Sequence, residues 1–275
     1  MEKITVKSEY FSPIDTLLSG QCFRFKEYKK GYLVISSDKI CYVYNDEDNV
    51  IIETEFLDYF ENYFDINFDY QSVYNFSKNF GNETLKLATE YSKGVRILKQ
   101  NPFETIFTFI VSQNNNVKRI ANTIQKLCEK VGEKLNSPFG EYYAFPTLEG
   151  LSLLTEEDYK SLGLGYRVRY FLELTNSLSS GLRLDDFETL TDLELYNALT
   201  SINGIGDKVA SCIMLFGYYR TNYFPVDTWV EKIYREDFDG TLKDRKKMSL
   251  YFTSQFGSYS GYIQQYLFYY KRFIK

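Results

Sequence analysis

Catalysis by this histidine-free sequence must use Lys, Asp, Glu, Cys or Tyr side chains, and a lysine and an aspartate in two short motifs are candidates. Lys208 follows two glycines, Gly204 and Gly206, in the segment INGIGDKVASC, and Asp227 stands in FPVDTW. An ordinary lysine is protonated at neutral pH, but partial burial and the dipole at a helix start favour the free amine, which can attack an electrophilic carbon. A carboxylate such as Asp227 can stabilise positive charge that develops beside it. Taken alone, Lys208 would equally fit a solvated lysine in the first turn of a helix.

The composition excludes several other kinds of catalysis. The chain of 275 residues contains no histidine, which rules out a Ser-His-Asp triad, a Cys-His pair, a histidine-ligated zinc and a histidine general base. The four cysteines, Cys22, Cys41, Cys128 and Cys212, are far apart and form no CxxC motif. We therefore expect neither an iron–sulfur cluster nor a zinc site on cysteines.

The segment from residue 195 to residue 216 predicts two helices joined by a tight turn. Apolar residues repeat at helical spacing on both sides of Gly204-Ile205-Gly206. The glycines permit a positive φ and the approach of a foreign group, and the free N–H groups that start the second helix can bind an anion. A dinucleotide fingerprint is excluded because a helix precedes the glycines and Val209 occupies the third glycine position. A plain turn between two core helices stays open.

The elements that must position this hairpin fall into two parts. Residues 1–95 contain short β-branched and aromatic segments, at 32–36, 40–44 and 50–54, which turn residues separate. We expect an antiparallel β-sheet domain here, followed by a mostly helical domain over residues 96–275. The predicted fold class is therefore α+β.

A helical pattern begins at Asn101. We expect Asn101 as the N-cap, Pro102 as the first helical residue and Glu104 as the glutamate of a capping box. A second helix follows the break at residues 114–116. Further helices are expected at residues 147–161, 166–180, 191–202, 207–218, 227–236, 242–256 and 259–273.

Six segments together form a pattern that is more specific than any one motif. They are LLSGQCFRF (17–25), NPFETIFTFIVSQNNNVKRI (101–120), LGLGYRVRYF (162–171), INGIGDKVASC (202–212), FPVDTW (224–229) and GYIQQYLF (261–268). In this order they resemble the helix-hairpin-helix DNA glycosylases, and among these the bifunctional 8-oxoguanine DNA glycosylase/lyases. The resemblance covers most of the chain and places the helix-hairpin-helix at about residues 191–218.

The resemblance implies a reaction and the residues that perform it. The lesion nucleotide is flipped out of the duplex, and Lys208 attacks its C1′ as the base departs while Asp227 stabilises the charge on the sugar. The resulting Schiff base permits β-elimination, which nicks the strand. Gly204 and Gly206 face the DNA phosphates, and no cofactor is required. Similar proteins hold a cation on hairpin carbonyls, which here belong to Thr200, Ile202 and Ile205.

The resemblance also assigns a base pocket. Gly20 matches the residue whose carbonyl accepts the N7 hydrogen that oxidised guanine has and guanine lacks. Cys212 and Phe268 match the residues on either face of the base, and Gln264 matches the residue that bonds its Watson–Crick edge. Without the resemblance, Cys212 and Phe268 would fit equally well as core residues.

The expected contacts with DNA follow from the same comparison. Asn114 matches the residue that fills the hole left by the flipped base, and Tyr166 matches the wedge beside the orphaned base. Arg119 and Arg167 match the donors to an orphaned cytosine, so a preference for cytosine is expected.

Two features depart from this pattern. Trp229 stands where eukaryotic members have a histidine, two residues after the aspartate. The net charge of −5 argues weakly against a nucleic-acid partner, so DNA affinity must come from a local surface. That surface is expected around four cations, Lys118, Arg119, Arg167 and Arg169.

The expected partner is double-stranded DNA that contains oxidised guanine. We expect a monomeric, cytoplasmic protein of prokaryotic type, which associates with the nucleoid during repair and contacts no membrane.

Two alternative functions stay open. A monofunctional glycosylase for alkylated bases would keep the aspartate, but Lys208 argues against it. A non-catalytic helix-hairpin-helix DNA-binding protein would leave Asp227 and Gln264 without a role.

Overall fold

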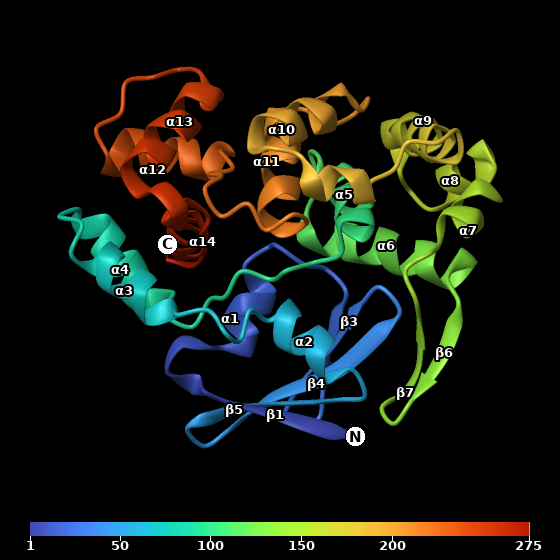
Figure 1. The fold of residues 1–275 in the computed structure, drawn as a ribbon, viewed down its shortest axis with the longest axis horizontal. Coiled ribbons are helices and arrows are strands. Elements are labelled where there is room, and N and C mark those ends of the chain that lie inside the picture. Colours follow the sequence, from blue (N-terminus) through green and yellow to red (C-terminus); the bar gives the residue numbers. More distant parts are fainter. Residues whose placement is uncertain (275) are drawn as a thin grey trace.

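An antiparallel five-stranded sheet fills the N-terminal part of the computed structural model, which describes residues 1–274 (Figure 1). Its strands are β1 (Glu2–Lys7), β2 (Phe25–Tyr28), β3 (Gly31–Ser36), β4 (Lys39–Asp46) and β5 (Asn49–Thr54), paired in the order β1-β5-β4-β3-β2. The three strands predicted from the sequence are β3, β4 and β5. The edge strands β1 and β2 were missed because they bury too few residues to show an apolar pattern.

Both faces of the sheet are covered, which explains why its central strands are mostly buried. One face packs against α1 (Pro13–Leu18) and α2 (Leu57–Tyr63), and its sheet residues are Val34, Cys41, Val43, Val50 and Ile52. The other face meets a two-stranded hairpin, β6 (Lys134–Ser137) and β7 (Gly140–Tyr143), through Tyr142. This hairpin lies in the part predicted to be mostly helical, and the sequence analysis did not expect it.

The remainder of the chain is mostly helical, as predicted. The helices before residue 162 are α3 (Tyr70–Lys78), α4 (Glu83–Tyr91), α5 (Pro102–Ser112), α6 (Val117–Val131), α7 (Leu148–Ser152) and α8 (Glu156–Ser161). Those after it are α9 (Val168–Ser179), α10 (Asp192–Ser201), α11 (Asp207–Phe216), α12 (Thr228–Asp237), α13 (Arg245–Phe256) and α14 (Ser260–Phe273), with short 3-10 turns at Ser8–Tyr10, Gly165–Arg167, Asp185–Thr189 and Gly257–Tyr259. The single helix expected over 147–161 is wrong: Thr155 starts a new helix there, with Asp158 completing a capping box.

The start of α5 confirms one local prediction and corrects another. The Asn101 side chain accepts a hydrogen bond from the backbone N–H of Glu104 at 3.1 Å, and Pro102 is the first helical residue. The carboxylate of Glu104 does not complete a capping box. It forms an ion pair with Arg24 at 3.1 Å and accepts the backbone N–H of Ser37 at 2.6 Å, so it joins α5 to the sheet.

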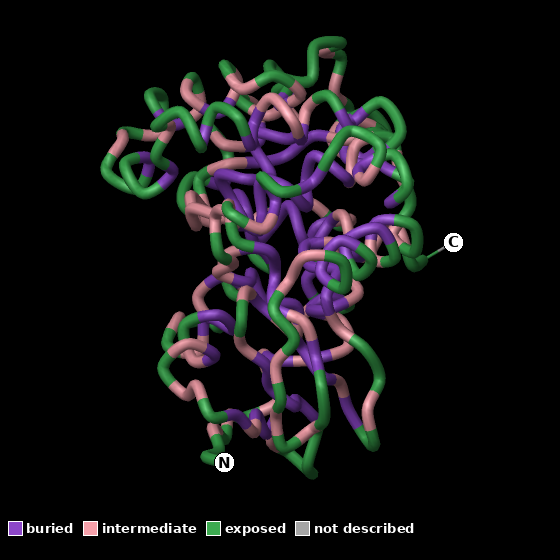
Figure 2. Tube along the Cα trace, turned by 90° about the vertical axis from the view of Figure 1, so that its right-hand side faces the viewer, coloured by how far each residue is buried: buried purple, intermediate pink, exposed green. Residues whose placement is uncertain are grey.

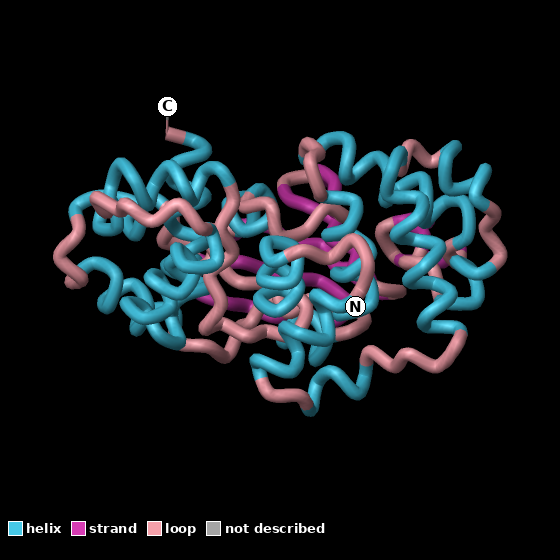
Figure 3. The backbone as a smooth tube through the Cα atoms, turned by 90° about the horizontal axis from the view of Figure 1, so that it is seen from above, coloured by secondary structure: helices cyan, strands magenta, loops and turns pink. Residues whose placement is uncertain are grey.

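Three buried helices form the centre of the helical part. Most residues of α5, α11 and α14 are buried, and Figure 2 shows buried chain between the sheet and the outer helices. Seen from above, the helices spread to both sides of the strands (Figure 3). Leu85 and Ala88 of α4 share a hydrophobic cluster with Ile263 and Leu267 of α14. Packing thus ties α4 to the C-terminal helices, and the predicted boundary near residue 95 stays a prediction.

Candidate active site

A small cavity collects the residues that the sequence analysis assigned to catalysis and to the base pocket. Its volume is about 50 Å³. Six predicted residues line it, Gly20, Lys208, Cys212, Asp227, Gln264 and Phe268. Five further residues complete the walls, Ser19, Phe109, Phe216, Pro225 and Gln265. The fold therefore brings four separate parts of the chain to one place: the end of α1, α5, the hairpin with the α12 start, and α14.

The hairpin places Lys208 at this cavity. Gly204 has a φ of +90°, and a side chain there would lie 2.4 Å from the ring of Tyr170, so only glycine fits. Gly206 has a φ of −89°, contrary to the expected positive value, and the space that its missing side chain leaves is open. Lys208 follows in the first turn of α11, half-buried, with its Nζ 5.6 Å from the centre of the Phe109 ring.

Asp227 reaches the same cavity as the N-cap of α12, which begins where the sequence predicted a helix over residues 227–236. Its Oδ1 accepts hydrogen bonds from the backbone N–H groups of Trp229 and Val230, both at 2.9 Å. Within residues 1–274, no hydrogen bond engages its other carboxylate oxygen. The helix start thus fixes the carboxylate and leaves one oxygen for a ligand.

Cys212 lies one helical turn after Lys208, and both Lys208 and Asp227 influence the pKa of its thiol. Burial raises the pKa of its thiol, the Asp227 carboxylate raises it further, and the Lys208 ammonium lowers it. The thiol is therefore neutral near pH 7 and forms a soft, uncharged wall.

Gly20 is held by the buried side chain of Gln21. The Gln21 amide donates to the carbonyl of Arg96 at 2.7 Å and accepts the N–H of Leu98 at 2.7 Å, which anchors the loop after α1. Gly20 has a φ of +83°, and a Cβ there would lie 3.5 Å from the ring of Phe268. The ring of Phe268 thus lies directly beside the Gly20 backbone.

Two neighbouring glutamines of α14 form the floor of the cavity. Gln264 and Gln265 are both buried, and the Gln265 amide donates to Oε1 of Gln264 at 2.8 Å. The family resemblance implied a role for Gln264 only. Gln265, Phe109 and Phe216 were missed because their helices are buried on all sides, where periodicity does not indicate which residue faces a cavity.

The residues assigned to the orphaned base cluster at another place, around the α5–α6 turn. Asn114 has a φ of +45°, and the exposed Tyr166 ring stacks on the Arg167 guanidinium at 4.5 Å. Arg167 was expected to be exposed, and this is wrong: it is 4% exposed and donates to the carbonyls of Gln113, Asn114 and Leu164. Arg119 is exposed and donates to the carbonyl of Gly163 at 3.5 Å.

The cationic surface expected around these residues is smaller than its sequence suggested. Arg169 is exposed but forms an ion pair with Glu173 at 2.6 Å, and Arg167 is buried. Lys118 and Arg119 are the exposed members of the set that form no ion pair among residues 1–274. Trp229, at the position of the expected histidine, is 41% exposed beside Asp227.

The hairpin carbonyls expected to hold a cation are neutral backbone oxygens. The carbonyl of Ile202 accepts the N–H of Ile205 at 3.0 Å, which leaves its second lone pair. Within the described chain, no group of three or more cysteines or carboxylates could hold a metal ion. A cation on Thr200, Ile202 and Ile205 would therefore meet neutral oxygens only, and its presence stays a prediction.

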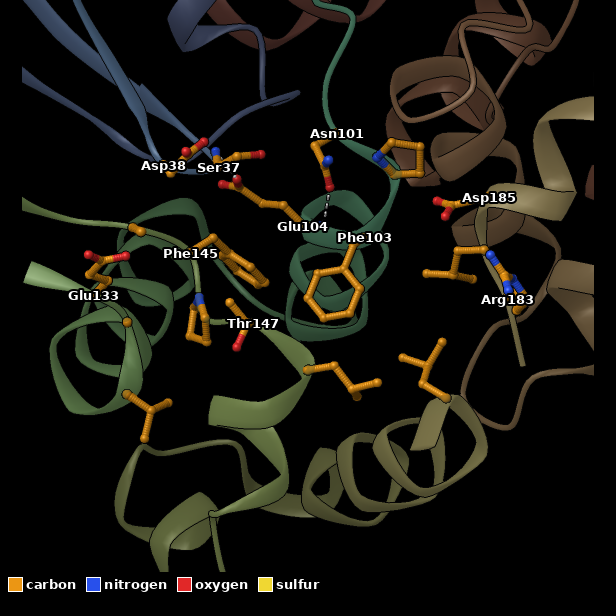
Figure 4. Close-up of a pocket in the computed structure, with 18 of the residues that line it drawn as sticks. Ser37, Asp38, Asn101, Phe103, Glu104, Glu133, Phe145, Thr147, Arg183 and Asp185 are labelled. Carbon is orange, nitrogen blue, oxygen red and sulfur yellow. Dashed lines mark hydrogen bonds between the residues drawn. The ribbon is translucent and has the colours of Figure 1, made fainter. Parts of the chain in front are cut away.

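A much larger cavity, of about 1020 Å³, lies at the opposite end of α5 (Figure 4). Phe103, Phe145, Leu178 and Leu182 line it together with carboxylates such as Asp185. No residue assigned to catalysis, base recognition or DNA binding lines it. The two cavities therefore differ in chemistry as well as in size.

The fold, with a lysine and an aspartate that line the same cavity, is that of a base excision DNA repair protein of the helix-hairpin-helix class. In agreement, residues 107–254 match the family described as HhH-GPD superfamily base excision DNA repair protein, and residues 3–106 match the 8-oxoguanine DNA glycosylase, N-terminal domain. The chain belongs to the 8-oxoguanine DNA glycosylase family of the HhH-GPD superfamily. This confirms the fold class and the resemblance inferred from the sequence.

Individual relatives agree with this family. The chain is 33% identical over 212 residues to an N-glycosylase/DNA lyase of Saccharomyces cerevisiae, covering 64% of this chain and 56% of the yeast protein. It is 34% identical over 189 residues to N-glycosylase/DNA lyase OGG1 of Arabidopsis thaliana, covering 64% and 52%. The chain thus spans about half the length of these curated relatives.

A solved structure is similar over nearly the whole chain. The 8-oxoguanine glycosylase/lyase of Clostridium acetobutylicum, bound to double-stranded DNA with cytosine opposite 8-oxoguanine, superposes with a TM-score of 0.90 at 35% identity. The match covers 96% of this chain and 92% of that one.

Among residues 1–274, no helix is both long and apolar enough to cross a membrane.

Proposed function

We propose that this protein excises 8-oxoguanine from double-stranded DNA and then nicks the strand at the same site. The observation that supports this most directly is the meeting of Lys208, Asp227 and Gly20 at one cavity, because the three come from distant parts of the chain. An amine, a carboxylate and a backbone acceptor are the groups that the reaction needs.

The substrate nucleotide must leave the duplex to react. C1′ of a stacked nucleotide is unreachable for a side chain in a cavity, so the lesion is flipped out and Asn114 takes its place in the stack. The cavity of about 50 Å³ has room for a few water molecules and is too small for a purine. Phe268, whose ring covers Gly20, must therefore move as the base enters.

Lys208 supplies the nucleophile. The lone pair of its neutral Nζ forms a bond to C1′ while the bond from C1′ to N9 breaks, and the bonding electrons leave with the base, which takes up a proton. Opening of the sugar gives a Schiff base between Nζ and C1′. Loss of a proton from C2′ then expels the 3′ phosphate by β-elimination. The Phe109 ring, with its centre 5.6 Å from Nζ, forms the wall beside the amine.

Asp227 stabilises the positive charge that develops on the sugar. Its Oδ1 is held by two backbone N–H groups, so the carboxylate needs no rearrangement when charge appears. The same two bonds explain why a helix start is a suitable place for this group.

The base pocket discriminates by donors and acceptors. The Gly20 carbonyl accepts the N7 hydrogen of oxidised guanine, whereas unmodified guanine offers only a lone pair at N7, which the carbonyl would repel. Cys212 and Phe268 enclose the base, and Gln264 bonds its Watson–Crick edge.

Opposite the flipped base, Tyr166 wedges into the stack while Arg119 donates to the orphaned cytosine. Arg167 contributes as well once it exchanges one of its carbonyl partners for the base.

Borohydride trapping on a duplex with 8-oxoguanine opposite cytosine tests this proposal. The reagent reduces the Schiff base to a stable amine, so a covalent complex of protein and DNA should form with 8-oxoguanine and not with guanine. Base release without a covalent complex would instead indicate the monofunctional alternative. Binding without release would indicate the non-catalytic one.

A further inference from the structure

One oxygen in the cavity wall has no hydrogen-bond partner among residues 1–274. It is Oε1 of Gln265, a residue that is only 3% exposed and lines the cavity. A buried acceptor that lacks a donor is costly, and in the wall of a cavity a bound ligand can supply the missing donor. The mechanism proposed above does not use Gln265.

The geometry of α14 shows that both glutamines serve the same cavity. Side chains of consecutive helical residues point about 100° apart and do not normally meet. Gln264 and Gln265 nevertheless contact one another at 2.8 Å, and both line the cavity. Because the Gln265 amide donates to Oε1 of Gln264, the Gln264 amide nitrogen stays available as a donor and Oε1 of Gln265 stays available as an acceptor.

This order of groups complements guanine and not other purines. The Watson–Crick edge of guanine presents a carbonyl oxygen at C6, an N–H at N1 and an amino group at C2. The Gln264 amide can donate to the first, its oxygen can accept from the second, and Oε1 of Gln265 can accept from the third. Adenine presents an amino group and a bare ring nitrogen at the first two positions, and hypoxanthine lacks the amino group.

We propose that Gln265 is a specificity-determining residue that accepts a hydrogen bond from the 2-amino group of the flipped 8-oxoguanine. The inference rests on the proposed function, because it names a further contact in the same base pocket. It explains the unpaired oxygen of the free protein, which the lesion base then satisfies. It also means that two glutamines share the recognition that the sequence assigned to one.

The test removes the same hydrogen bond from either side. Excision of 8-oxoguanine is compared with that of 8-oxohypoxanthine, which lacks only the 2-amino group, in identical duplexes opposite cytosine. The unmodified protein should prefer 8-oxoguanine by about tenfold in kcat/KM, since one hydrogen bond in a buried site is at stake. Gln265→Met keeps the length of the side chain and removes the acceptor, so the preference should fall to about one.

Two further variants keep the result interpretable. Gln265→Glu retains an acceptor oxygen at the same position and should keep the preference even if its overall rate falls. Gln125→Leu removes an exposed glutamine of α6 and should leave the preference unchanged. Nicking of a preformed abasic site, which contains no base, normalises each variant for the amount of competent protein.

The outcomes separate this inference from the proposed function. If Gln265→Met still prefers 8-oxoguanine as strongly as the unmodified protein does, Gln265 does not bind the amino group and the inference is overturned. Equal excision of both lesions by the unmodified protein overturns it too. Failure of the unmodified protein to excise 8-oxoguanine at all would overturn the proposed function itself.

Discussion

The two cavities at the ends of α5 differ in the chemical groups that line them, and the smaller cavity has the reactive ones. The cavity of about 1020 Å³ at the start of the helix is wide, and apolar side chains and scattered carboxylates line it. The cavity of about 50 Å³ near the other end contains an amine, a carboxylate, a thiol and two carboxamides. The smaller space therefore has the groups that a reaction on a nucleotide requires, and the larger one does not.

The charges of the two cavities are also held in different ways. Glu104, beside the large cavity, is neutralised by Arg24 and by the Ser37 N–H, so it is committed to the fold. Asp227, in the small cavity, has backbone bonds on one oxygen only. A carboxylate with an available oxygen can act on a substrate, whereas a fully paired one stabilises the fold. The following variants test this difference, in order of decreasing effect on excision.

Replacement of Lys208 should have the largest effect. Lys208→Gln keeps a side chain of similar length but cannot form a Schiff base. Because the chain contains no histidine, no imidazole can act in place of the lysine amine. Base release and borohydride trapping should fall below detection while binding to the lesion duplex stays measurable. Trapping at the normal level would show that another amine reacts and would separate the chemistry from this cavity.

Replacement of Asp227 by asparagine should lower excision on the order of 10³-fold without unfolding the protein. The amide oxygen can still accept the N–H groups of Trp229 and Val230, so the cap of α12 is retained while the negative charge is lost. Single-turnover rates measure the loss, and circular dichroism measures the fold. An unfolded variant would show that Asp227 is structural.

The sequence predicted six of the residues that line the small cavity, because these residues stand in specific motifs. Gly20 and Lys208 are far apart in the chain, and no periodicity brings them together. Their meeting was expected only from the order of six family segments. Gln265 was not predicted, because α14 is buried on nearly all sides and its pattern does not show which glutamine faces a ligand.

The fold was predictable where the sequence has a clear local signal, such as a β-branched or aromatic run between turn residues or a capping residue before an apolar helix pattern. The strands β3 to β5 and the helix starts at Asn101 and Asp227 followed from local patterns and caps. The hairpin of β6 and β7 was not, since four-residue strands give little signal and their role is to cover a distant sheet face. Arg167 was placed at the surface because arginines are mostly exposed, but three backbone carbonyls compensate its burial here.

The base opposite the lesion should have a moderate effect. Cytosine offers the acceptors O2 and N3 to Arg119, whereas adenine presents an amino donor, and such a mismatch costs roughly 1 to 3 kcal/mol. Excision opposite cytosine should therefore be about tenfold faster than opposite adenine. Arg119→Ala should reduce this ratio towards one with trapping retained, and Arg167→Ala should do so as well.

Arg183→Ala is the matched control for these variants, because it removes an exposed arginine from the edge of the large cavity. It should leave the ratio unchanged. Equal excision opposite all four bases by the unmodified protein would show that Arg119 serves the phosphates or the solvent. A changed ratio in Arg183→Ala would instead connect the large cavity with recognition of the orphaned base.

The smallest effect on excision is expected from Glu104, although its effect on stability is large. Glu104→Ala leaves the buried Arg24 without its ion-pair partner, which typically lowers the free energy of unfolding by about 3–5 kcal/mol. Urea denaturation measures that loss, and a Glu104→Leu, Arg24→Met double variant, which leaves no unpaired charge, should recover much of it. The excision rate per folded molecule should stay unchanged, and borohydride trapping counts the folded fraction. The reason is that Glu104 lies more than one helical turn from Phe109 on α5, and of these two residues only Phe109 lines the small cavity. A slower rate in the folded fraction would mean that α5 transmits changes from one cavity to the other, and the two could then no longer be treated as independent.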